Sequence, residues 1–288
     1  MKVYVAYLAT DGGRDAVALG VQLARTMGAE LAIGMVVPPD QTGAFVSGDL
    51  VDQVLTAQAR TWLKQAEALV PDDVEVSTHI GVYDSIAGGI IAEAERLEAT
   101  VVVAGGTGGG LLGRHSLGAV VNDLIHSSPV AVALAPRGQR HSKAERVRSV
   151  TCAVGARAGA DELLDAAIAG AERAGVPLRL ASLIAVDLMP GVHQADQEAI
   201  EKARAHSAAV LEEATARLSG TVEVTSVVVL GDTVEDAVNG LDWEPGDLIM
   251  VGSSRLAAPK RLFLGSTAAK MLRVLDVPMV VVPRAGLA

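Results

Sequence analysis

The stretch VVVAGGTGGGLLGRHSLGA, residues 101–119, passes from a β-branched apolar run into a glycine-rich loop. Five of the six residues at 105–110 are glycine. Glycine loses more conformational freedom on folding than any other residue, so ordering such a loop costs free energy. Two kinds of loop justify that cost: one whose backbone must approach a phosphate closely, and one that must stay mobile. The stretch therefore bears on both the fold and the function.

Outward from this stretch, apolar strand-like runs alternate with amphipathic or alanine-rich stretches. This alternation is typical of a parallel sheet with helices on both faces, so we predict an α/β fold. Strands are expected near 3–10, 30–37, 74–80, 100–104 and 130–135, and again near 149–154, 178–185, 222–229, 247–251 and 278–283. Helices are expected near 14–28, 50–69, 84–98, 118–127, 160–174, 195–219, 233–242 and 266–276.

The two halves of the sequence are copies of each other. ATVVVAGGTGG, which starts at 99, corresponds to GDLIMVGSSRL, which starts at 246. Gly105 and Gly252 are 147 residues apart, and so are Gly118 and Gly265. A repeat of this length indicates a duplicated domain, because solenoid repeats have periods of up to about 50 residues.

The duplication predicts two tandem doubly wound domains, at 1–137 and 148–288. The segment RGQRHSKAERVR lies between the copies and is polar and basic, so we expect a linker at 138–147. Trp62 and Trp243 are expected to anchor helices to the two cores.

Composition and charge exclude several classes of partner. Half of the 288 residues are hydrophobic and the net charge is −10. Nucleic acids and anionic membrane surfaces are bound through basic patches, so neither is expected as a partner. The chain enters a strand-like pattern at once, without a signal peptide or a membrane-spanning run, and its one cysteine, Cys152, lies in an apolar run. Together these features predict a cytoplasmic protein.

Two common phosphate-binding motifs do not explain the glycine loop. A P-loop ends in Gly-Lys-Ser/Thr, and no glycine in this chain is followed by lysine. GGGLLG at 108–113 satisfies the dinucleotide pattern G-x-G-x-x-G. That pattern should follow the first strand and precede an acidic residue about 20 positions on. Here it follows the fourth strand, and the next strand carries no acid.

A third spacing fits better. Gly105, two residues, Gly108, nine residues and Gly118 resemble the G-x2-G-x9-G-[S/T] signature of the ATP-binding class of universal stress proteins. The resemblance covers essentially the whole chain, as two tandem domains. It implies that each domain is a five-stranded parallel sheet of order 3-2-1-4-5 with helices on both faces. It also implies binding of ATP or a related adenine nucleotide, with magnesium, and pairing of the last strands PVAVALAP and PMVVVP within one chain. A dimer of tandem chains is a further expectation.

The chemistry of the signature is clear without the family. Glycines after the fourth strand expose main-chain N–H groups to a phosphate, and the third glycine precedes a helix whose N-terminus favours an anion. Such a site lies at the carboxyl ends of the strands, beside the switch point of the sheet. Four basic residues of the two loops are candidates for local positive charge, namely Arg114, Arg255, Lys260 and Arg261.

The sequence also departs from the family pattern. Ala119 takes the place of the hydroxyl residue in the first half, and Arg255 replaces the middle glycine in the second. Arg255 could clamp a phosphate or fill the site. The family's aspartate after strand one aligns with Leu8 and Gly155, and Asp11 lies three residues beyond Leu8. The candidate nucleotide-binding residues are Asp11, Val37, Gly105, Thr107, Gly108, Gly109, Gly118, Ala119, Gly252, Arg255, Gly265 and Ser266.

Each candidate has a simpler alternative. The glycine loop can be a ligand-free surface loop, Ser266 and Thr267 can cap a helix, and Asp11 and Asp15 can stabilise a helix N-terminus. Spacing indicates no metal site, no Ser-His-Asp arrangement and no pair of catalytic carboxylates. We therefore predict no catalytic residues and no enzyme, with slow ATP hydrolysis left open.

Two functions remain. The first is a cytoplasmic stress-response protein that binds an adenine nucleotide, chiefly in the first half, as a sensor or switch. The alternative is a degenerate family member that binds no nucleotide and acts as a protein-interaction scaffold. The fold alone does not distinguish them.

Overall fold

The structure is a computed structural model of the whole chain. It describes residues 1–39, 48–106, 118–154, 160–189, 197–216, 222–254 and 262–283. No helix within these ranges is both long and apolar enough to cross a membrane.

Each half alternates strands and helices, as the sequence predicts. The first half contains β1 (Lys2–Ala6), α1 (Asp11–Met27), β2 (Glu30–Val37), α2 (Gly48–Glu67), β3 (Val76–Val82), α3 (Ile86–Arg96), β4 (Ala99–Gly105), α4 (Ala119–Ser127) and β5 (Ala131–Ala135). The second contains β6 (Ser149–Ala153), α5 (Ala160–Ala174), β7 (Leu178–Ala185), α6 (Gln197–Ala216), β8 (Val224–Gly231), α7 (Val234–Asn239), β9 (Asp247–Gly252), α8 (Ser266–Val274) and β10 (Met279–Val282). Two short 3-10 helices, Gln139–His141 and Val186–Leu188, complete the described elements.

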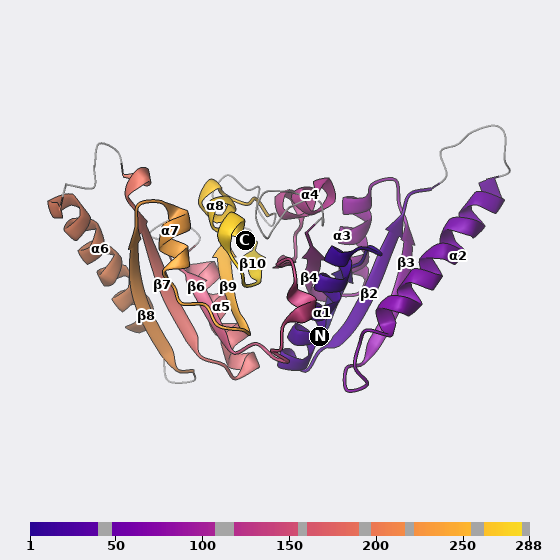
Figure 1. Cartoon of the computed structure of the whole chain (residues 1–288), viewed down its shortest axis with the longest axis horizontal. Coiled ribbons are helices and arrows are strands. Elements are labelled where there is room, and N and C mark those ends of the chain that lie inside the picture. The colour runs from indigo at the N-terminus through magenta and orange to yellow at the C-terminus, as the bar shows by residue number, and fades with distance from the viewer. Residues whose placement is uncertain are drawn as a thin grey trace.

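The strands form one ten-stranded sheet of order β3-β2-β1-β4-β5-β10-β9-β6-β7-β8 (Figure 1). Each half has the order 3-2-1-4-5 implied by the family resemblance, and within each half neighbouring strands run parallel. The halves meet where β5 and β10 pair antiparallel, with Ala133 opposite Val280. The expected pairing of the last strands within one chain is confirmed.

Alternation along the strands divides the apolar side chains between two cores. Val3 and Val5 of β1 lie in one core, whereas Tyr4 between them lies in the other. The first core contains residues of α1, α2, α5 and α6, and the second contains residues of α3, α4, α7 and α8. Because both faces of the sheet are covered, its strands are apolar almost without interruption, which explains the runs seen in the sequence.

The segment that joins the halves packs along α1. The Gln139 side chain is buried and donates a hydrogen bond to the Gln22 amide oxygen at 3.0 Å. Further along, Gln22 donates to the carbonyl oxygen of Arg146 at 3.1 Å, and the Val147 N–H donates to the Thr26 hydroxyl at 2.8 Å. The polar composition of this segment predicts a linker. In the structure, polar groups of the segment form hydrogen bonds with polar side chains of α1.

Candidate functional site

The candidate residues of the first half meet at the carboxyl edge of the sheet. β1 lies between β2 and β4, so Val37 at the end of β2 and Gly105 at the end of β4 flank the turn that leads into α1. Gly118 precedes α4 at the same edge. Gly252 ends β9, and Gly265 precedes α8 in the second half. The fold therefore produces two separate clusters, one in each half.

The first turn of α1 contacts the end of β4 through backbone atoms. A Cβ atom on Gly105 would lie 1.8 Å from the Gly12 carbonyl oxygen, and one on Gly12 would lie 1.8 Å from the Gly106 carbonyl oxygen. No side chain fits at either position. Gly105 is thus required for packing of α1 against β4, a role separate from any contact with phosphate. The sequence did not reveal Gly12 as its partner.

The turn between β1 and α1 carries no carboxylate at the position of the family's aspartate. Leu8 stands there, and its side chain is 47% exposed. A Cβ atom on Gly13 would lie 1.8 Å from the Leu8 carbonyl oxygen, so the turn is as tight as glycine allows. Thr10 caps α1 by accepting a hydrogen bond from the Gly13 N–H at 3.2 Å.

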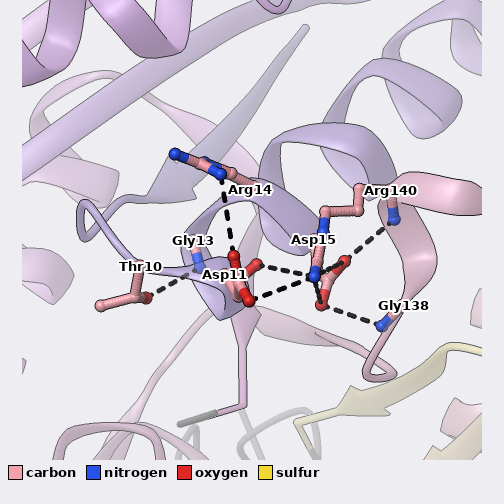
Figure 2. A network of polar contacts seen from close by, with 7 residues as sticks. All are labelled: Thr10, Asp11, Gly13, Arg14, Asp15, Gly138 and Arg140. Atoms are coloured by element: carbon pink, nitrogen blue, oxygen red, sulfur yellow. Dashed lines mark hydrogen bonds and ion pairs between the residues drawn. The ribbon is translucent and has the colours of Figure 1, made fainter.

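Asp11 is the first residue of α1, and basic side chains surround it (Figure 2). Its carboxylate lies 3.2 Å from the Arg140 guanidinium and 3.7 Å from that of Arg14. The Asp11 side chain is 61% exposed. A carboxylate in the first turn also interacts favourably with the helix dipole, which agrees with the simpler alternative that Asp11 stabilises the helix N-terminus.

Asp15, one turn further into α1, is the most constrained acid near the site. Its side chain is 2% exposed and accepts hydrogen bonds from the N–H groups of Gly138 and Arg140, both at 2.9 Å. The Arg140 guanidinium donates to both of its oxygens at 3.0 Å (Figure 2). A buried carboxylate is stable only when charge and hydrogen bonds compensate it, and here they do. No signal in the sequence linked Asp15 to Arg140.

Both helices that follow the glycine loops begin after a glycine. Gly118 is the N-cap of α4 and Gly265 is the N-cap of α8, and neither N-cap residue forms a side-chain capping hydrogen bond. The predicted positions of these glycines are confirmed. Ala119 and Ser266 are the first helical residues, so neither Ser266 nor Thr267 is the N-cap residue of α8. Helix N-terminal N–H groups without a cap, together with the helix dipole, favour an anion.

In the second half, the residues just after β9 are hydrogen bonded to the residues just before α8. The N–H of Phe263 donates to the Ser253 hydroxyl and the N–H of Ser254 donates to the Phe263 carbonyl oxygen, both at 2.8 Å. Ser253 is buried. These bonds tie the segment after Gly252 to the residues that precede α8.

The same segment contacts the first half. Leu262 and Leu264 donate hydrogen bonds to the carbonyl oxygens of Ser128 and Ile125, at 2.9 and 3.1 Å. The rings of Phe263 and His126 meet edge to face with centroids 4.8 Å apart. One end of α4 thus belongs to the first candidate site, and the other end contacts residues 262–264 of the second half.

Several candidates lie outside the described residues, namely Thr107, Gly108, Gly109, Arg114, Gly155, Arg255, Lys260 and Arg261. Among the residues that the structure does describe, no three His, Cys, Asp or Glu side chains cluster as metal ligands. Cys152 is fully buried, and burial raises the pKa of its thiol to about 12.

Comparison with known proteins gives consistent matches along the chain. A model of the universal stress protein family matches residues 1–136 and 146–283. Universal stress proteins of Mycobacterium tuberculosis (strain ATCC 25618 / H37Rv) and Mycobacterium bovis are each 31% identical over 296 residues, which cover 98% of this chain and 100% of theirs. A solved universal stress protein from Archaeoglobus fulgidus is 16% identical with a TM-score of 0.59, covering 98% of this chain and 96% of that one. A functionally unknown protein from Pseudomonas aeruginosa PAO1 is 16% identical with a TM-score of 0.56, covering 98% and 92%.

Proposed function

Because the chain belongs to the universal stress protein family, we propose that its first half binds ATP or a related adenine nucleotide and acts as a sensor or switch. The observation that carries the proposal is the N-terminus of α4. It begins at Gly118, an N-cap residue that forms no side-chain capping hydrogen bond, at the same edge of the sheet as Gly105. Its N–H groups suit the phosphates of a nucleotide.

The residues present fit the phosphate part of the ligand better than the sugar part. The first turn of α4, from Gly118 and Ala119, would hold phosphate oxygens through backbone N–H groups. Arg14 and Arg140 also lie at the first turn of α1, where Asp11 and Asp15 already balance their charge. Leu8 offers no carboxylate to accept a hydrogen bond from a ribose hydroxyl. The nearby carboxylate of Asp11 is already paired with Arg14 and Arg140.

The proposed role is binding without catalysis. A nucleotide that binds with magnesium only to the native state would stabilise that state. Val37 at the end of β2 would lie beside the base, and α4 would respond to the phosphates. Since the C-terminal end of α4 also contacts residues 262–264 of the second half, occupancy in one half would be transmitted to the other.

A second candidate function is a scaffold that binds no nucleotide. Two observations favour it. Leu8 presents an exposed apolar side chain where the family's aspartate stands, and the carboxylate of Asp11 is already paired with arginines. In the second half, a hydrogen bond from the Phe263 N–H to the Ser253 hydroxyl joins the residues on either side of the loop.

Thermal unfolding with and without millimolar ATP, AMP and cyclic AMP, each with magnesium, distinguishes the two. A ligand at about 100 times its Kd stabilises the native state by about 2.7 kcal/mol, which raises Tm by several degrees. Ala119→Glu should abolish that rise, because it places a carboxylate at the phosphate position, although a glutamate in the first turn favours the helix itself.

Asn122→Glu, one turn further on and also exposed, is the matched control and should keep the rise. Ala119→Ser, which restores the family's hydroxyl, should increase it. If no nucleotide changes Tm in the unmodified chain, the scaffold is favoured and nucleotide binding is rejected.

A further inference from the structure

The outer edge of β8 is open in the described structure. β8 pairs with β7 and ends the order of the sheet. The N–H of Leu178 donates to the Glu223 carbonyl oxygen at 2.9 Å, which fixes the residues that face β7. Because backbone groups alternate along a strand, the N–H and C=O groups of Val224, Ser226, Val228 and Leu230 point away from β7. None of the eight residues of β8 is buried, whereas most of β7 is.

The sequence of β8 does not protect this edge. VTSVVVLG contains no charged residue and no proline, and five of its residues are β-branched. Natural edge strands are usually guarded by a charge, a proline, a bulge or a short length. An open edge of this composition readily accepts another extended chain.

A groove lies beside the edge. It is about 510 Å³ in volume and lies between residues of β8 and of α6, which lies next to β8 at one end of the molecule (Figure 1). The helix side is lined by Ala208, Leu211, Glu212, Thr215 and Ala216, and the strand side is lined by Ser226, Val227 and Val228. Apolar side chains of an added strand would therefore find space against α6.

Acidic side chains surround this apolar strip. Glu212 lines the groove, and Glu223 and Asp232 flank the two ends of β8. All three are exposed, and none forms an ion pair with a described residue. The strip therefore favours an occupant that is apolar in the middle and basic at both ends.

The same acids disfavour a second copy of this chain. Two β8 strands paired antiparallel through their outward backbone groups would bring Glu223 of each copy close to Asp232 of the other, at both ends. The opposite edge of the sheet, β3, is flanked by Glu75 and Asp84, so pairing β8 with β3 of another copy also brings like charges together. Like charges facing each other across strands are destabilising.

We propose that the β8 edge is a docking site for an extended segment of a partner protein. The segment adds to the sheet as an edge strand, inserts apolar side chains between β8 and α6, and pairs basic residues with Glu212, Glu223 and Asp232. This interaction is independent of nucleotide binding and uses the end of the molecule far from the candidate site of the first half.

A defined peptide tests the proposal on the full chain. Fluorescein-labelled Lys-Val-Thr-Val-Thr-Val-Thr-Val-Thr-Lys spans the positions from Glu223 to Asp232, and its counterpart with glutamate at both ends reverses the charge. Fluorescence anisotropy should show saturable binding of the lysine peptide and about tenfold weaker binding of the glutamate peptide. Hydrogen exchange should slow at the amides of Val224, Ser226, Val228 and Leu230.

Two variants locate the interaction. Ser226→Pro removes an outward N–H of β8 and should abolish binding, whereas Thr78→Pro at the corresponding outward position of β3 should leave it unchanged. Where Ser226→Pro lowers Tm below the assay temperature, the combined change of Glu212, Glu223 and Asp232 to lysine decides instead, since it should reverse the preference between the peptides.

Several results would overturn the proposal. These are no binding of either peptide, equal binding of both, binding that survives Ser226→Pro in a folded variant, and a charge-reversed chain with unchanged preference. Sedimentation that shows a dimer of the unmodified chain, lost in Ser226→Pro, would make a second copy the occupant and also reject the proposal.

Discussion

The Asp15 carboxylate and Arg140 are joined by three hydrogen bonds although 125 residues separate them. The backbone N–H of Arg140 donates to Asp15 at 2.9 Å, and its guanidinium donates to both carboxylate oxygens. The same guanidinium lies 3.2 Å from Asp11 (Figure 2). One arginine of the joining segment thus connects two acids of α1 and holds the segment against the first half.

Asp15→Ala should lower the free energy of unfolding by about 3 kcal/mol, because removing one partner leaves a half-buried guanidinium and two N–H groups without their acceptor. Asp11→Ala removes an exposed carboxylate beside the same arginine and should cost less than about 1 kcal/mol. Urea denaturation of both variants measures the difference. Equal costs would show that the contact between Asp15 and Arg140 does not hold the segment.

Gly105→Ala should be strongly destabilising, by about 3 kcal/mol or more, because its Cβ atom would meet the Gly12 carbonyl oxygen and α1 would have to shift. Gly170→Ala is the matched control. Gly170 lies within α5, where a Cβ atom would approach only the Met250 sulfur, at 4.0 Å. That change should stabilise the chain by about 0.5–1 kcal/mol, as alanine does within a helix. Thermal unfolding of the two variants should shift in opposite directions, and a mild loss in Gly105→Ala would contradict the close contact.

Glu93 provides a prediction about pH. Its carboxylate is 6% exposed and accepts hydrogen bonds from Arg96 at 2.6 Å and from the Tyr83 hydroxyl at 2.9 Å. The Arg96 guanidinium is the main reason that the pKa of Glu93 lies below its ordinary value of 4.5, and the Tyr83 hydroxyl lowers this pKa further while burial opposes both. A group whose native pKa is lowered stabilises the fold above its unfolded pKa. That stability is lost as the pH falls through the native pKa.

Glu93→Gln should therefore cost about 2 kcal/mol at pH 7, the value of a hydrogen bond to a charged group, and progressively less below about pH 4.5. Urea denaturation of both chains between pH 7 and pH 3 checks this. A difference that stays constant over the whole range would mean that the carboxylate charge does not contribute.

Cys152 should be unreactive in the native protein. Burial raises the pKa of its thiol to about 12, and only a thiolate reacts with a disulfide reagent. We expect labelling by a chromogenic disulfide at pH 8 to follow global unfolding, slow in buffer and complete within seconds in denaturant. Fast labelling of the native chain would show that β6 opens locally.

The sequence was sufficient for features that depend on local pattern. The runs around Val3, Val101 and Val150 predict strands because both of their faces are buried, and the duplicated register of Gly118 and Gly265 places both glycines at helix starts. The order 3-2-1-4-5 came from the family resemblance, and the pairing of β5 with β10 followed from it.

Long-range contacts could not be predicted in this way. The sequence predicts Asp15 to be an ordinary acidic residue near a helix start, because its contact with Arg140 forms only in the folded chain. In the same way, Gly12 resembles any turn glycine in the sequence, and its contact with β4 is known only once the strand is placed beside it. Trp243 follows α7 and packs against the second core, and its ring N–H donates to the Val238 carbonyl oxygen of α7, so the expectation for it is confirmed. The Arg179 guanidinium lies over its ring at 4.9 Å. The expectation for Trp62 was wrong, because this residue of α2 is 38% exposed and belongs to neither core. The position of Trp62 in the sequence of α2 does not predict whether another element of the fold packs over its ring.

The antiparallel pairing of β5 with β10 has a consequence for how this protein can change over generations. Two identical subunits joined through such strands must carry every substitution twice, once in each site. Here the two halves share one gene product but have separate residues, so Ala119 can stand in one site while Ser266 stands in the other. A mutation can then be selected for its effect on one half while the other half keeps its original chemistry, and division of labour becomes open to a molecule that keeps the symmetry of a dimer.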